Sequence, residues 1–200
     1  ALGGAYAVFA KLKQLIESQS SHSVTIHDLL QRRFEYLVSD RVFTCATDGN
    51  HGRSVAWGTQ LFGCRCVIYI HGDVSSGRQQ AMEELGAEVI RITGNYDDSV
   101  RQAEGDAKTN GRIIVSDTSY DGQMEIPRTI ALGYTVMLKE IVDQLQGEMP
   151  THVFIQGGVG GLASAVCAYF WQVWHAARPR LIVVEPESAN CLLQSARNGS

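Results

Sequence analysis

Hydrophobic and polar residues alternate along the chain in blocks that are typical of strands and helices in turn. Short apolar runs rich in Val and Ile predict buried strands, because both faces of a parallel strand are covered in an α/β protein. These runs are VFTCA (42–46), CVIYI (66–70), AEVIRI (87–92), RIIVSD (112–117), HVFIQ (152–156) and RLIVVEP (180–186). Stretches with apolar residues near helical spacing separate them, at 52–62, 77–85, 96–109, 129–146 and 161–175.

This order of elements predicts an α/β fold class with a mostly parallel, doubly wound sheet, since right-handed crossovers join strands that alternate with helices. A further helix is expected in GGAYAVFAKLKQLIESQ (3–19), and a solvated loop over 18–28. A polar segment with Gly and Pro at 121–127 separates two sets of strands. We therefore expect one α/β lobe over residues 1–125 and the start of a second over residues 126–200.

The two ends of the chain predict a fragment of a longer protein. The sequence opens without Met inside an expected helix and closes at SARNGS without a capping element.

Composition narrows the class of protein. The chain has a 44% hydrophobic fraction, a net charge of −4 and scattered basic residues, so we expect neither nucleic acid nor a membrane surface as a partner. The apolar runs have the length of strands and are too short to span a bilayer. The odd number of cysteines, five, favours reduced thiols and a cytoplasmic location. The pair Cys64-x-Cys66 lacks a second pair at ligand spacing, so no metal site is predicted.

A glycine-rich turn follows strand 152–156 and opens a helix, in the sequence QGGVGGLASAV (156–166). Its residues Gly158, Gly160 and Ala163 match the dinucleotide fingerprint G-x-G-x-x-G/A, and the next strand ends in an acid, Glu185, although somewhat beyond the usual offset of about 20 residues. The same turn could bind the single phosphate of a phosphorylated cofactor at the helix N-terminus. Tight packing between strand and helix is a third explanation. The local pattern leaves all three open.

A second polar turn, TDGNHG (47–52), follows strand 42–46 and also opens a helix. Its backbone amides form a nest of the kind that binds a carboxylate, with Asp48 beside it as a candidate proton acceptor. The alternative is that Asp48 and Asn50 are turn formers or helix caps and that His51 is a satisfied surface residue. Asp117, at the end of strand 112–117, is either a substrate contact or a turn residue.

Several segments resemble the fold-type II pyridoxal-phosphate enzymes, the group of the tryptophan synthase β-chain and threonine dehydratase. TDGNHGRSVAW resembles their cofactor-side loop, GRQQAMEELGAEVIRI the unit that follows it, and GGVGG their phosphate loop. A longer series is similar to the diaminopropionate ammonia-lyase family in order and spacing over nearly the whole chain. It consists of LGGAYA, TDGNHGRSVAW, VIYIHG, NYDDSVR, SDTSYDG…IPRTIALGY, PTHVFIQGGVGG and IVVEPESANCL.

The resemblance implies two lobes of the tryptophan synthase β-like fold, pyridoxal 5'-phosphate as cofactor and a homodimer. It implies α,β-elimination of an amino-acid substrate, 2,3-diaminopropionate, to pyruvate and two ammonia. Serine or threonine dehydration on the same fold is the alternative, followed by a dinucleotide-binding oxidoreductase. The Schiff-base lysine of the family would directly precede Ala1, and the partner of the pyridine nitrogen would follow Ser200.

The resemblance also implies a role for individual residues. Asp48 stands where dehydratases have Ser or another small residue, and it would be the catalytic base for one enantiomer of the substrate. Asp117 would bind the distal amino group of the substrate, and Asn50 would lie beside the O3′ oxygen of the cofactor. Backbone amides would bind the cofactor phosphate at Gly157, Gly158, Val159, Gly160 and Gly161. The loop for the substrate carboxylate would include Thr47, Gly49 and His51.

Overall fold

The computed structural model describes residues 2–20, 23–118 and 124–199 and divides into two compact units, Ala1–Asp117 and Thr118–Ser200. The boundary predicted between residues 125 and 126 lies after this division, in the first turn of a helix that begins at Glu125. The predicted seam at 121–127 falls partly on residues 121–123, which lie outside the described residues. Each unit is described by itself below.

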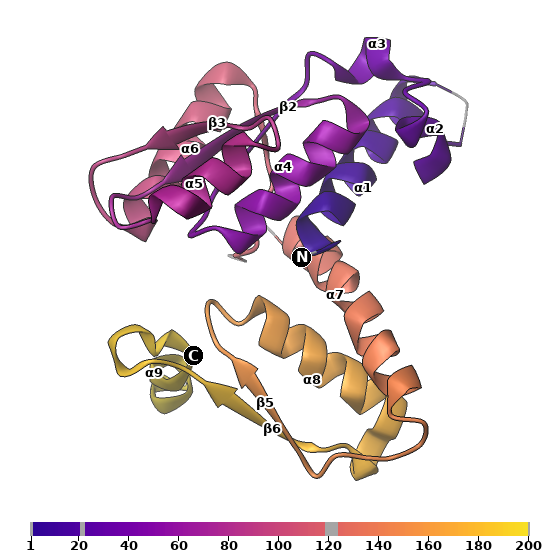
Figure 1. Cartoon of the computed structure of the whole chain (residues 1–200), viewed down its shortest axis with the longest axis vertical. Helices are drawn as coiled ribbons and strands as arrows, with labels where there is room; N and C mark the ends of the chain where they lie inside the picture. The colour runs from indigo at the N-terminus through magenta and orange to yellow at the C-terminus, as the bar shows by residue number, and fades with distance from the viewer. Residues whose placement is uncertain (1, 21–22, 119–123, 200) are drawn as a thin grey trace. The chain divides into compact units, whose positions relative to one another are not determined.

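The first unit alternates strands and helices after an N-terminal group of helices (Figure 1). In chain order its elements are α1 (Leu2–Gln19), α2 (Ile26–Leu30), α3 (Glu35–Val38), β1 (Val42–Ala46), α4 (Asn50–Phe62), β2 (Arg65–Ile70), α5 (Ser76–Glu83), β3 (Glu88–Arg91), α6 (Tyr96–Asn110) and β4 (Ile113–Ile114).

Among the described residues of this unit, four strands form one sheet in the order β3-β2-β1-β4, and each pairing is parallel. The chain passes outward from β1 to β3 and then returns to the other side of β1. Right-handed crossovers therefore place α4 and α5 on one face and α6 on the other. The strand order reverses between β1 and β4, and the carboxyl ends of strands at such a switch point form the usual ligand site of an open α/β sheet.

The core of the unit consists of apolar side chains on both faces of the sheet. Val67 and Tyr69 of β2 pack on Ala103 of α6, whereas α4 packs on α1. Gly58 allows the close approach of these two helices, because a Cβ there would lie 2.7 Å from the Cα of Ala5. Burial raises the pKa of the Cys66 thiol to about 12, which makes this cysteine a packing residue rather than a reactive one.

The second unit contains a two-stranded parallel sheet with helices packed beside it (Figure 1). Leu138 of one helix and Val166 and Phe170 of the next form its buried cluster. Its elements are α7 (Glu125–Gln144), β5 (His152–Gln156), α8 (Gly161–Trp174), the 3-10 turn η1 (His175–Ala177), β6 (Arg180–Val184), the 3-10 turn η2 (Glu187–Ala189) and α9 (Cys191–Asn198).

The α/β class and the parallel pairing confirm the prediction from sequence, and strands 42–46 and 152–156 have the predicted bounds. The predicted strand 112–117 is too long, since only Ile113 and Ile114 pair with β1. The predicted loop over 18–28 is also wrong in part. Helix α1 extends to Gln19, and α2 begins at Ile26 behind a capping box of Thr25 and Asp28. Over the described residues, helices of the length and apolarity needed to cross a membrane are absent.

Candidate active site

The turn between β1 and α4 is held by the buried side chain of Thr47. Its Oγ1 accepts hydrogen bonds from the amides of Gly49, at 3.0 Å, and Gly52, at 3.1 Å. Gly49 is the N-cap of α4 at φ 148°, in the region that favours glycine, and has no side chain with which to cap the helix. The interpretation of Asp48 or Asn50 as the helix cap is therefore wrong. The first-turn amides of Asn50 and His51 lack an intrahelical acceptor, as at any helix start, and can bind an anion.

His51 connects this turn to the end of β4. Its Nε2 lies 2.7 Å from the carbonyl oxygen of Val115, and because a carbonyl can only accept, Nε2 donates. Its Nδ1 lies 3.9 Å from Oδ2 of Asp117. His51 is 8% exposed, so the surface interpretation is wrong for this residue. The contact brings the turn and Asp117 together at the carboxyl ends of β1 and β4, where the sheet has its switch point.

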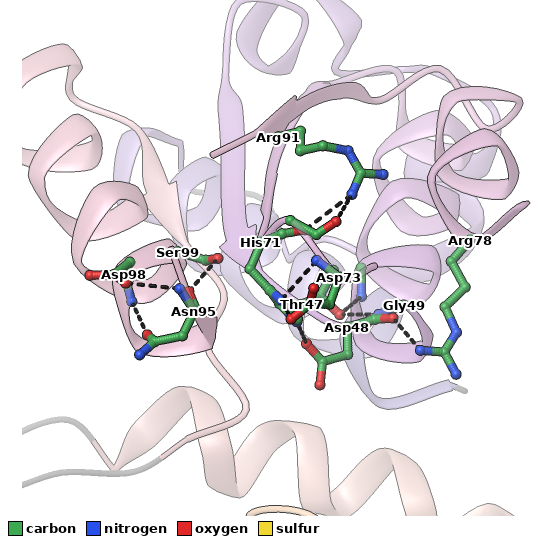
Figure 2. A network of polar contacts seen from close by, with 12 residues as sticks. Thr47, Asp48, Gly49, His71, Asp73, Arg78, Arg91, Asn95, Asp98 and Ser99 are labelled. Atoms are coloured by element: carbon green, nitrogen blue, oxygen red, sulfur yellow. Dashed lines mark hydrogen bonds and ion pairs between the residues drawn. The ribbon is translucent and has the colours of Figure 1, made fainter. Parts of the chain in front are cut away.

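Asp48 projects from the same turn and has a partner that the sequence did not predict. Its side chain is 63% exposed, and its Oδ1 lies 3.0 Å from Nε2 of His71, which follows β2 (Figure 2). Arg78 Nη1 donates to the backbone carbonyl of Asp48 at 3.3 Å. Asp48 is thus a carboxylate at the rim of the turn, accessible to a ligand and hydrogen-bonded on one oxygen.

The glycine loop of the second unit begins where β5 ends and leads into α8. Gly157 has no room for a side chain, because a Cβ there would lie 2.6 Å from Cγ of Glu185. Gly160 caps α8 with φ 91°. Together they place a bare backbone turn before the first amides of a 14-residue helix. A backbone turn of this kind can hold a phosphate group. Phosphate binding is the role predicted for the backbone amides of Gly157, Gly158, Val159, Gly160 and Gly161.

Glu185 is engaged in a way that disfavours the dinucleotide interpretation. Its carboxylate accepts from the amides of Leu192, at 3.0 Å, and Leu193, at 2.9 Å, in the first turn of α9. A dinucleotide site would need this acid to bind a ribose hydroxyl. Glu185 instead satisfies a helix N-terminus.

Comparison with known proteins agrees with the phosphate interpretation. Residues 1–200 match the family model described as pyridoxal-phosphate dependent enzyme. A diaminopropionate ammonia-lyase of Salmonella typhimurium (strain LT2) is 39% identical over 198 residues, which are 98% of this chain and 49% of that protein.

Two solved structures of the Escherichia coli diaminopropionate ammonia lyase are similar over the whole chain. The complex with D-serine has a TM-score of 0.90 at 36% identity, covering 100% of this chain and 50% of that one. The complex with an aminoacrylate-PLP azomethine reaction intermediate has a TM-score of 0.86 at 35% identity, covering 100% and 49%. The chain spans about half the length of the curated relatives it matches.

Proposed function

Because the chain belongs to the family of pyridoxal-phosphate-dependent enzymes, we propose that it catalyses the α,β-elimination of 2,3-diaminopropionate to pyruvate and two molecules of ammonia. The observation that carries the proposal is the exposed carboxylate of Asp48 at the switch point of the sheet. Serine and threonine dehydratases have a small residue at this position. An acid here would give the enzyme a second base beside the Schiff-base lysine. Its similarity to diaminopropionate ammonia-lyases over nearly all its residues supports the same choice.

The roles of the residues are those that the resemblance to the family implies. The glycine loop 157–161 would hold the phosphate of the cofactor, and Asn50 would be the residue beside its O3′ oxygen. The amides of the turn over Thr47, Gly49 and His51 bind the carboxylate of the substrate. Pyridoxal phosphate, when bound, supplies an electron sink that acidifies the α-proton of the substrate. Asp48 removes that proton from one face, and the family lysine expected before Ala1 serves the other face.

The proposal includes a cytoplasmic homodimer. The five cysteines are all free, which supports a reducing compartment. The dimer follows from the resemblance to the family.

Product stoichiometry tests the proposed reaction. The full-length enzyme, loaded with cofactor, is expected to release two ammonia for each pyruvate from 2,3-diaminopropionate, because both amino groups leave the carbon skeleton. Serine, which carries one amino group, gives one ammonia per pyruvate. Coupled assays for pyruvate and ammonia on the same sample measure the ratio. Faster turnover of serine or threonine than of diaminopropionate would assign the enzyme to the dehydratases instead.

Substrate selectivity is expected to depend on Asp117. Its side chain is 26% exposed and lies at the switch point beside the buried His51, so it can bind the distal ammonium of diaminopropionate. A charge-assisted hydrogen bond of this kind contributes about 1.5–3 kcal/mol. Asp117→Asn is therefore expected to reduce the preference for diaminopropionate over serine by about 10- to 150-fold in kcat/KM. An unchanged ratio of the two kcat/KM values would show that Asp117 does not select the substrate.

A further inference from the structure

The register of the sheet places His71 opposite Asp48. Strands β1 and β2 pair in parallel from Val42↔Arg65 to Ala46↔Tyr69. Two residues beyond the last pair, the same register aligns Asp48 with His71. Both residues follow the carboxyl ends of adjacent parallel strands, and this is the edge at which ligands bind. The contact between their side chains is therefore a consequence of the strand register.

The hydrogen bonds of the His71 ring define its tautomer and its direction. The amide of Asp73 donates to Nδ1 at 3.4 Å, so Nδ1 is the acceptor and the ring hydrogen lies on Nε2. Nε2 then donates to Oδ1 of Asp48 at 3.0 Å. The imidazole is largely buried, with 16% of its side chain exposed, whereas the carboxylate of Asp48 is 63% exposed. A largely buried donor thus contacts an exposed acceptor.

The main chain on both sides of this contact is fixed by further side chains (Figure 2). Arg91, at the end of β3, donates through Nη1 to the carbonyls of His71, at 3.2 Å, and Gly72, at 2.7 Å. Its Nη2 donates to Oε1 of Gln79 in α5 at 2.8 Å. On the other side, Thr47 and Arg78 hold the backbone around Asp48. With both backbones anchored, the orientation of the Asp48 carboxylate is the remaining freedom, and His71 is what restricts it.

We propose that His71 is a positioning residue that orients the Asp48 carboxylate for proton abstraction. The inference rests on the proposed role of Asp48 as a base. Because Oδ1 accepts from His71, Oδ2 is the oxygen that would accept the proton. The α-C–H bond of the substrate breaks, its electron pair stays on the substrate, and the proton forms an O–H bond at Oδ2. A base held in position reacts faster than one that samples several rotamers, since correct geometry removes part of the barrier.

The test compares D- and L-2,3-diaminopropionate as substrates of the full-length, cofactor-loaded enzyme. His71→Leu removes the donor. It is expected to lower kcat/KM about 10- to 150-fold, the effect of losing a hydrogen bond to a charged group, and only for the enantiomer that depends on Asp48. The other enantiomer monitors folding and cofactor loading. His71→Gln retains an amide donor near the position of Nε2 and is expected to restore most of the lost rate. His27→Leu, at an exposed histidine of α2, is the matched control.

A second readout needs no turnover. In cofactor-free protein labelled with 15N-histidine, the His71 ring is expected to show the Nε2–H tautomer, and Asp48→Asn is expected to shift its Nε2 resonance. The His71→Gln spectrum assigns the signal.

The outcomes separate the two proposals. If Asp48→Asn is selective for one enantiomer and His71→Leu leaves that enantiomer unaffected, the positioning role is overturned while the assignment of the base stands. Equal loss of both enantiomers in His71→Leu would mean a structural role and would also overturn it. If Asp48→Asn is not selective, the assignment of the base fails and the positioning role fails with it. An Nδ1–H tautomer contradicts the proposed direction of the hydrogen bond.

Discussion

Asp48→Asn is expected to remove turnover of one enantiomer of 2,3-diaminopropionate and to leave the other near its original rate. The amide cannot accept a proton, whereas its size and its contact with His71 are nearly those of the carboxylate. Loss of a general base lowers the rate by about 10²- to 10⁴-fold. Separate kcat/KM measurements for the D- and L-substrates give the result.

The matched control for this experiment is Asp40→Asn. Asp40 is also exposed and flanks the same strand, but it precedes the amino end of β1, whereas Asp48 follows the carboxyl end. The charge change is the same and only the edge of the sheet differs, so Asp40→Asn is expected to affect neither enantiomer. If Asp48→Asn lowered both enantiomers equally, two bases on opposite faces would be the wrong description.

Gly157→Ala is expected to weaken cofactor binding and to destabilise the second unit. The new Cβ would lie 2.6 Å from Cγ of Glu185 and 2.9 Å from Cγ1 of Val183, both close to the backbone of β6. Overpacking of this kind costs about 1–3 kcal/mol, which corresponds to about a 5- to 150-fold loss of affinity if the loop absorbs the strain. Displacement of Glu185 would also release the first amides of α9, a loss of about 0.5–2 kcal/mol. Titration of the apoenzyme with pyridoxal phosphate and thermal unfolding of the apoenzyme measure the two effects.

Gly158→Ala is the control for the steric argument. A Cβ at Gly158 would meet no atom within 4 Å, so the melting temperature of the apoenzyme is expected to stay unchanged. Equal melting temperatures for Gly157→Ala and Gly158→Ala would show that the contact with Glu185 does not constrain the loop.

The sequence predicts the parts of the fold that depend on local pattern. Strands such as 152–156 form short apolar runs, and the bounds of this strand are correct because polar or glycine residues adjoin it. Its predicted burial is wrong, since the residues of β5 alternate between exposed and half-buried. Strand β4 is overestimated because its apolar run continues to Val115 while its pairing with β1 ends at Ile114. The short helix α2 was missed, although the pattern Thr25-x-x-Asp28 is a capping signal that could have indicated it.

The parts of the site that consist of one short segment could be predicted from the sequence. The contacts between residues that are distant in the sequence could not. The turn 47–52 and the glycine loop stand out by composition alone. The hydrogen bond between His71 and Asp48 joins residues 23 apart, and that between His51 and Val115 joins residues 64 apart. The sequence gives no local sign of either contact. Aligning the ends of adjacent strands would have indicated His71, since both β1 and β2 were predicted.

The register between β1 and β2 has a consequence for how this chemistry can be transferred between proteins. The proposed base, the imidazole proposed to orient it and the guanidinium that holds the main chain at His71 all lie within residues 47–91, one contiguous segment running from the end of β1 to the end of β3. Asp117, which we assign to the distal amino group, lies outside it. A recombinant exchange of this segment alone would therefore carry the base and its support into a related scaffold while leaving the recognition of the distal amine with the recipient.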